Sequence, residues 1–159
     1  ANVAEIVFKV ATIPTIVNYK SFLLVMRAVS PITNTDQLRM QFSQDNGATW
    51  LAAGYLSGSL YTAYNSAVMS NANSTTYCAL SGPIDTGSQY NCSLSLYNLN
   101  SADYSSINGV ANYEDTTLAT EAMGTISAIA NTSINAIRLG MSTGNIKDGY
   151  FSLYGVKES

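Results

Sequence analysis

The chain has 159 residues, the usual size of one domain, and its 47% of hydrophobic residues can form a core, so a single domain spanning residues 1–159 is expected. Only 11% of its residues are charged, against about 25% in an average domain, so the surface must be polar mainly through Ser, Thr, Asn and Tyr. The seven basic residues are scattered and the net charge is -3, which excludes nucleic-acid binding. No apolar run approaches the ~20 residues of a membrane span, which excludes membrane insertion.

Three strands are expected in the first third of the chain, at residues 6–10, 22–26 and 37–43. The second of these segments is apolar on both faces, which predicts a central strand covered on both sides. In the third, Leu38, Met40 and Phe42 point one way and polar side chains point the other, which is the pattern of a half-buried strand. Pro14 and Pro31 end pairing after the first two strands.

Further strands are expected wherever short apolar segments are bounded by turn-forming residues: 54–64, 76–80, 91–99, 105–113, 123–129, 134–142 and 150–156. The separators are rich in Asn, Gly, Ser and Asp and predict turns at 45–47, 71–74, 81–83, 142–145 and 148–149. Residues 117–131 could also form a helix, although Gly124 disfavours it. Many short strands without alternating helices predict an all-β fold, an antiparallel, jelly-roll-like β-sandwich.

The two cysteines are Cys78 and Cys92. Each is in phase with apolar residues of its predicted strand, Leu80 for Cys78 and Leu94 for Cys92. The favoured interpretation is two buried, reduced thiols, because free cysteine is among the most buried residue types. The alternative is one disulfide between neighbouring strands, which would close a short loop.

One local motif is specific. Residues 43–50 fit the pattern S-x-D-x-G-x-T-W, which resembles the Asp-box of sialidases and related β-propellers. The defining residues are Ser43, Asp45, Gly47, Thr49 and Trp50. Gly47 can adopt the positive φ angle of a tight turn, and the carboxylate of Asp45 can accept backbone N–H bonds across it. Trp50 is expected to pack beneath this structural hairpin.

The Asp-box pattern does not predict glycosidase activity. In sialidases the motif is a structural hairpin that recurs in successive propeller blades, whereas here it occurs once. A propeller needs several four-stranded blades, which 159 residues cannot supply. Sialidase chemistry also needs an arginine cluster, and this chain has three arginines.

Other catalytic arrangements fail on composition. The chain has no histidine, so Ser-His-Asp and Cys-His machinery is impossible. The only adjacent carboxylates, Glu114 and Asp115, would point to opposite faces of a strand and make a poor acid–base pair. We therefore expect no enzyme, no catalytic residues, no cofactor and no metal site. Calcium is the one ion left open, because several aspartates lie in or near predicted loops. They are Asp45, Asp85, Asp103, Asp115 and Asp148.

The C-terminal segment carries a family resemblance. Residues 142–157 follow the pattern S-x-G-N-I-x-x-G-x-F-x-L-Y-G-V-K, which is similar to the hairpin that closes many bacteriophage tail-fibre, head-fibre and capsid-decoration proteins. Such proteins also resemble this chain in the order of an apolar strand, an L-R-x-x-x-S segment and an Asp-box hairpin, here residues 22–26 and 38–50. The resemblance implies a virion location, a β-sandwich fold and a repeated copy or homo-oligomer, and it implies no catalytic residues.

Two functions of different classes follow. The first is assembly: a non-enzymatic virion subunit of the capsid-decoration, head-fibre or tail-accessory kind, which binds other virion proteins and predicts an oligomer with an apolar contact patch. The second is adhesion: a receptor- or carbohydrate-binding module that contacts host surface glycan through aromatic rings and polar side chains. The candidate rings for adhesion are Tyr55, Tyr61, Tyr64, Tyr104 and Tyr113.

Overall fold

The computed structural model describes residues 2–9, 19–62, 69–99, 105–113, 126–129 and 133–157. Every regular element in this part of the chain is a strand, so it contains no helix that could cross a membrane. The strands are β1 (Glu5–Lys9), β2 (Ser21–Pro31), β3 (Asp36–Ser43), β4 (Tyr55–Thr62), β5 (Met69–Ser74), β6 (Cys78–Ile84), β7 (Tyr90–Tyr97), β8 (Ser105–Asn112), β9 (Ile126–Ile129), β10 (Ala136–Met141) and β11 (Ile146–Val156).

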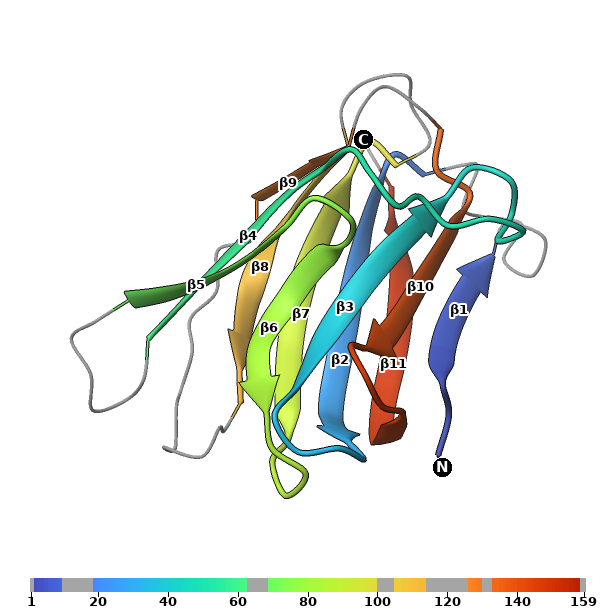
Figure 1. The fold of residues 1–159 in the computed structure, drawn as a ribbon. Coiled ribbons are helices and arrows are strands. Elements are labelled where there is room, and N and C mark those ends of the chain that lie inside the picture. Colours follow the sequence, from blue (N-terminus) through green and yellow to red (C-terminus); the bar gives the residue numbers. More distant parts are fainter. Residues whose placement is uncertain are drawn as a thin grey trace.

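These strands form two antiparallel sheets. One has four strands in the order β1-β10-β3-β6, and the other has seven in the order β11-β2-β7-β8-β9-β4-β5. In Figure 1 the four-stranded sheet lies in front of β11, β2, β7 and β8, while β4, β5 and β9 continue the larger sheet to one side. The predicted all-β, antiparallel β-sandwich is confirmed.

The core lies between the two sheets and follows the predicted alternation. On β3 the side chains of Leu38, Met40 and Phe42 are fully buried, and the residues between them are half-exposed. The facing sheet contributes Leu24 and Leu94, which are also fully buried. Each such side chain adds about 1.5–3 kcal/mol through removal of apolar surface from water.

Two corners of the sandwich are joined by one carboxylate. Asp36, at the start of β3, is 1% exposed, and it accepts hydrogen bonds from the backbone N–H groups of Ser142, Thr143 and Gly144 at 2.8, 3.1 and 2.8 Å. The Ser142 hydroxyl and the Gln37 N–H also donate to it. Burial by itself raises the pKa of Asp36, but these hydrogen bonds outweigh it, and the pKa lies below the ordinary value of 3.8. The β2–β3 and β10–β11 corners are therefore fixed to each other.

The predicted turn at Asp148 and Gly149 is a β-bulge inside a longer strand, so β11 begins at Ile146 rather than at residue 150. The pairing of β11 with β2 shifts register on both sides of Asp148. On β2, Ala28 takes a φ of 53°, and its N–H leaves the ladder to donate to Asn91 Oδ1 at 2.9 Å. Bulges of this kind redirect side chains and often lie beside functional sites.

Two other predicted turns are also wrong. Residues 71–74 belong to strand β5, which pairs with β4, and residues 81–83 belong to β6. Pro83 is tolerated there because β6 is the edge strand of its sheet and a proline cannot donate to a further strand. Polar, turn-forming residues on edge strands explain both errors.

The expectation that the strand at residues 22–26 is covered on both faces was wrong. Strand β2 is covered on one face only: Phe22, Leu24 and Met26 are buried, whereas Leu23 and Val25 on the opposite face are half-exposed. In the segment that could have formed a helix, Ile126–Ile129 is strand β9. The remainder of that segment lies outside the described residues.

Candidate binding surface

The side of the seven-stranded sheet that faces away from the core is open between β11 and β8. We call this surface the outer sheet face. It consists of the outward residues of β11, β2, β7 and β8, which are Tyr150, Ser152, Tyr154, Val156, Ser21, Leu23, Val25, Arg27, Ser93, Ser95, Tyr97, Ser106, Asn108 and Val110. No described segment covers these side chains, and most of them are neutral.

Exposed apolar side chains gather on this face. Six large hydrophobic residues are exposed in the described part of the chain, and all except Ile32 belong to the outer sheet face. The most exposed are Tyr150 at 67%, Val110 at 62% and Tyr154 at 56%. Single exposed hydrophobic residues are normal, whereas a contiguous group of them is typical of a binding surface.

The outer sheet face carries one charge among its described residues. Arg27 lies over the ring of Tyr150, with its guanidinium carbon 5.8 Å from the ring centroid. The other polar groups are serine hydroxyls and an asparagine amide. A face of this composition suits an uncharged surface on a partner, because it gains apolar contact without burying unpaired charges.

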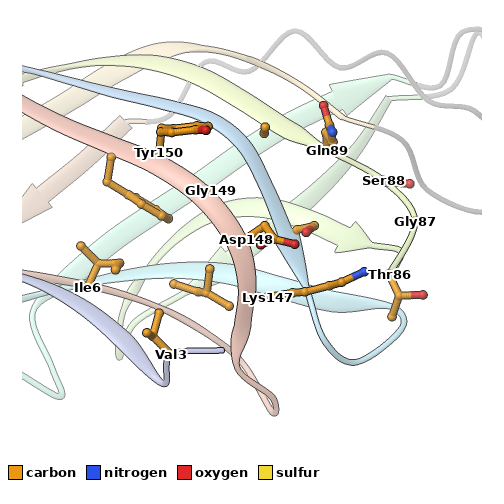
Figure 2. A pocket seen from close by; sticks show the side chains of 14 residues that line it. Val3, Ile6, Thr86, Gly87, Ser88, Gln89, Lys147, Asp148, Gly149 and Tyr150 are labelled. Atoms are coloured by element: carbon orange, nitrogen blue, oxygen red, sulfur yellow. The ribbon is translucent and has the colours of Figure 1, made fainter. Parts of the chain in front are cut away.

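A groove adjoins the outer sheet face at the bulge of β11. We call it the bulge groove; its volume is about 570 Å³. Its apolar part includes Val3, Ile6 and Phe151, and its polar part includes Thr86, Ser88, Gln89, Lys147 and Asp148, with Tyr150 at the border with the sheet face. In Figure 2 the ribbon of β11 passes between Tyr150 and Gln89 on one side and Val3 and Ile6 on the other.

The polar rim of the bulge groove is held in place by the neighbouring corner. The N–H of Thr86 donates to Asn34 Oδ1 at 3.0 Å, and the N–H of Ser88 donates to the carbonyl of Asp85 at 3.0 Å. The loop between β6 and β7 is thus fixed beside the bulge. Hydroxyl, amide and carboxylate groups next to an exposed ring can bind a neutral sugar.

Two of the five tyrosines predicted to bind a ligand have described side chains. Tyr55 and Tyr113 lie in the core, at 1% and 3% exposure, so neither ring presents a face to solvent. Tyr64, Tyr104 and the side chain of Tyr61 lie outside the described residues. Among the described residues the exposed tyrosine rings are Tyr97, Tyr150 and Tyr154. The strand phase of Tyr150 and Tyr154 could not be assigned from sequence because both phases of β11 contain apolar residues.

Tyr55 and Tyr113 satisfy buried backbone groups. The Tyr55 hydroxyl accepts from the N–H of Phe42 at 3.0 Å and donates to the carbonyl of Leu51 at 3.1 Å. The Tyr113 hydroxyl accepts from the N–H of Gly82 at 2.7 Å. Burial raises the pKa of Tyr55 to about 12, so the hydroxyl keeps its proton. These two tyrosines are structural.

The Asp-box residues form the expected turn. Asp45 Oδ1 accepts from the Ser43 hydroxyl at 2.6 Å and the Thr49 N–H at 2.8 Å, and Oδ2 accepts from the Thr49 hydroxyl at 2.6 Å. These bonds hold the pKa of Asp45 well below its usual range. Gly47 has a φ of 84°, and the guanidinium of Arg138 lies 4.7 Å from the Trp50 ring.

The strands on either side of the Asp-box turn do not form a hairpin, contrary to expectation. Strand β3 belongs to the four-stranded sheet and β4 to the seven-stranded sheet. The N–H of Leu51 donates to the carbonyl of Phe42 at 2.9 Å, which joins the two ends of the turn. The motif therefore shapes a crossing between sheets.

Cys78 and Cys92 are both buried, as predicted, and no disulfide joins them in the structure. Burial raises the pKa of Cys92 to about 12. In the described part of the chain, no three acidic, cysteine or histidine residues converge as a metal ion would require. Asp103 and Asp115 lie outside that part.

Comparison with known proteins gives no assignment: no protein-family model matches the chain, and no curated protein matches it. The surfaces described above are therefore the basis for a functional proposal.

Proposed function

We propose that the chain is a non-catalytic bacteriophage virion protein that assembles with further copies of itself through the outer sheet face. The observation that supports this most directly is the concentration of exposed apolar residues there. Five of the six exposed large hydrophobic residues of the described part share that face. The C-terminal sequence pattern, which resembles phage virion-surface proteins, supports the virion location.

The charge of the face favours a second copy as the partner. Two identical surfaces that meet around a two-fold axis bring like charges into one interface, which costs energy when charges are numerous. Here Arg27 is the one charged side chain among the described residues of the face, and the ring of Tyr150 already contacts it. Two copies can therefore pack together with little repulsion.

The size of the face sets the strength of the contact. Four strands at a spacing of about 4.8 Å and seven residues at a rise of about 3.3 Å give a flat area of about 400 Å². Two such faces bury about 800 Å² in total, below the roughly 1,200 Å² of stable complexes. We expect reversible association in dilute protein, strengthened on a particle where many copies are held close together.

The test measures association directly. Analytical ultracentrifugation over a concentration series is expected to show reversible dimers, and Tyr154→Ser is expected to shift the equilibrium toward monomer. Ser93→Thr on the same face is a matched control, because it keeps the face neutral and removes no apolar contact. Association that is unchanged in Tyr154→Ser would exclude the outer sheet face as the contact.

A second candidate function, glycan binding, is favoured by the bulge groove. Tyr150 is the most exposed large hydrophobic residue of the described part, and hydroxyl and amide groups of the 86–89 loop share its groove. Sugar rings stack on such aromatic faces. On an array of neutral glycans, binding that is lost in Tyr150→Ala but kept in Tyr154→Ala would support this function. Equal loss in both variants, or no binding, would reject it.

A further inference from the structure

The outward face of the four-stranded sheet has a different character from the outer sheet face. Two of the chain's three arginines, Arg39 and Arg138, lie there on the neighbouring strands β3 and β10. Together with Glu5 and Gln41 they line a shallow pit of about 230 Å³. This pit, which we call the Arg39 pit, lies on the opposite sheet from the surface of the proposed function and is independent of it.

The two arginines differ in how they are satisfied. Arg138 donates from Nε and Nη2 to Gln41 Oε1, at 3.0 and 2.6 Å, and pairs with Glu5 at 3.3 Å. Arg39 makes no ion pair with a described residue, and its Nε is buried without a hydrogen-bond partner. No carboxylate in the described part of the chain therefore neutralises the charge of Arg39.

Arg39 is held rigidly enough to serve as a binding group. Its guanidinium lies 4.3 Å from the ring centroid of Tyr77, and the Tyr77 hydroxyl donates to Gln37 Oε1 at 3.1 Å. On the other side, Gly140 pairs with Arg39 and contributes no side chain. The pit therefore has a fixed cationic wall beside an open floor.

We propose that the Arg39 pit binds the carboxylate of an acidic sugar unit. An arginine fork matches a planar carboxylate, and the local charge of two arginines and one glutamate matches a single negative charge. Glu5, whose Oε2 pairs with Arg138, has its second carboxylate oxygen to accept from a sugar hydroxyl, whereas both lone pairs of Gln41 Oε1 are taken by Arg138. A peptide C-terminus fits less well, because sites that bind a peptide carboxylate use free backbone N–H groups. The N–H groups of β10 are already used, because this strand pairs with β1 on one side and β3 on the other.

The three arginines make the test direct, since their Nε–H groups give separate signals in a ¹⁵N-correlated NMR spectrum. Titration with sodium glucuronate is expected to shift the Arg39 signal with saturation in the millimolar range, whereas glucose leaves it unmoved. In Arg39→Gln we expect the affinity for glucuronate, followed through the Arg138 signal, to fall about tenfold or more. Arg27→Gln is the matched control, because Arg27 also lies over a tyrosine ring but on the other sheet. The affinity of the Arg27→Gln variant for glucuronate should equal that of the wild type.

A second variant guards against misfolding as an explanation. Gly140→Val fills the floor of the pit while leaving both arginines in place, and a Cβ at this position has no neighbour closer than 3.4 Å. Weakened glucuronate binding in this variant supports the pit. The proposal is overturned by the absence of a saturating shift, by unchanged affinity in Arg39→Gln, or by equal affinity for N-acetylalanine, which would indicate a protein carboxylate instead.

Discussion

Replacement of Asp36 by Asn tests how the two corners of the sandwich are joined. The carboxylate accepts five hydrogen bonds, four on Oδ1 and one, from Gly144, on Oδ2. An asparagine oxygen can replace Oδ1, but its NH₂ group then faces the Gly144 N–H, donor against donor. One charge-assisted bond is lost and the others weaken, so we expect Asp36→Asn to lower the free energy of unfolding by about 2–4 kcal/mol.

The assay is urea denaturation at pH 7, with Glu5→Gln as control. Glu5 makes a surface pair with Arg138, and its loss should cost about 1 kcal/mol or less. The pH dependence gives a second check. Because the folded-state pKa of Asp36 is lowered, its stabilisation is full above the unfolded value near 3.8 and is lost as the pH falls through the lower folded-state value. The difference between wild type and Asp36→Asn should therefore shrink below about pH 4. A difference under about 0.5 kcal/mol at pH 7, or one independent of pH, would refute this account of the corner.

Three further predictions concern the turn, the core and the thiols. Gly47→Ala should destabilise the protein by about 1–2 kcal/mol in thermal melts, because the position has a φ of 84°. Gly87→Ala should be neutral in the same melts, because a Cβ added at that position meets no atom within 4 Å. Tyr55→Phe should cost about 1–3 kcal/mol in urea denaturation, since the buried Phe42 N–H loses its acceptor; an unchanged stability would contradict that role. Because both thiols are buried, iodoacetamide at pH 8 should leave the native protein unmodified. In denaturant without reductant it should add two carbamidomethyl groups, measured by intact mass. No addition in denaturant would reveal a disulfide.

Much of the fold could be predicted from sequence where one strand face is apolar and the other polar. Leu38, Met40 and Phe42 fixed the phase of β3, and their burial agrees with the prediction. Strand boundaries failed where edge strands contain turn-forming residues, as with Pro83 in β6. At Gly149 a bulge and a turn need the same residue type, so the sequence could not distinguish them.

The binding surfaces were harder to predict. Tyr55 and Tyr150 both lie in aromatic-rich strands, yet one is buried and the other is two-thirds exposed. Which phase of a strand faces the core depends on what the opposite sheet presents, and this is not a local property of the sequence. The Arg39 pit likewise depends on the pairing of β3 with β10, which are separated by about a hundred residues along the chain.

The central claim, self-assembly through the outer sheet face, is tested most directly by light scattering on the purified protein over a range of concentrations. The account predicts a weight-average mass that rises reversibly above the monomer mass of 16.9 kDa, and a Tyr154→Ser variant that stays close to it. A wild-type mass that remains at the monomer value at every concentration would contradict the claim.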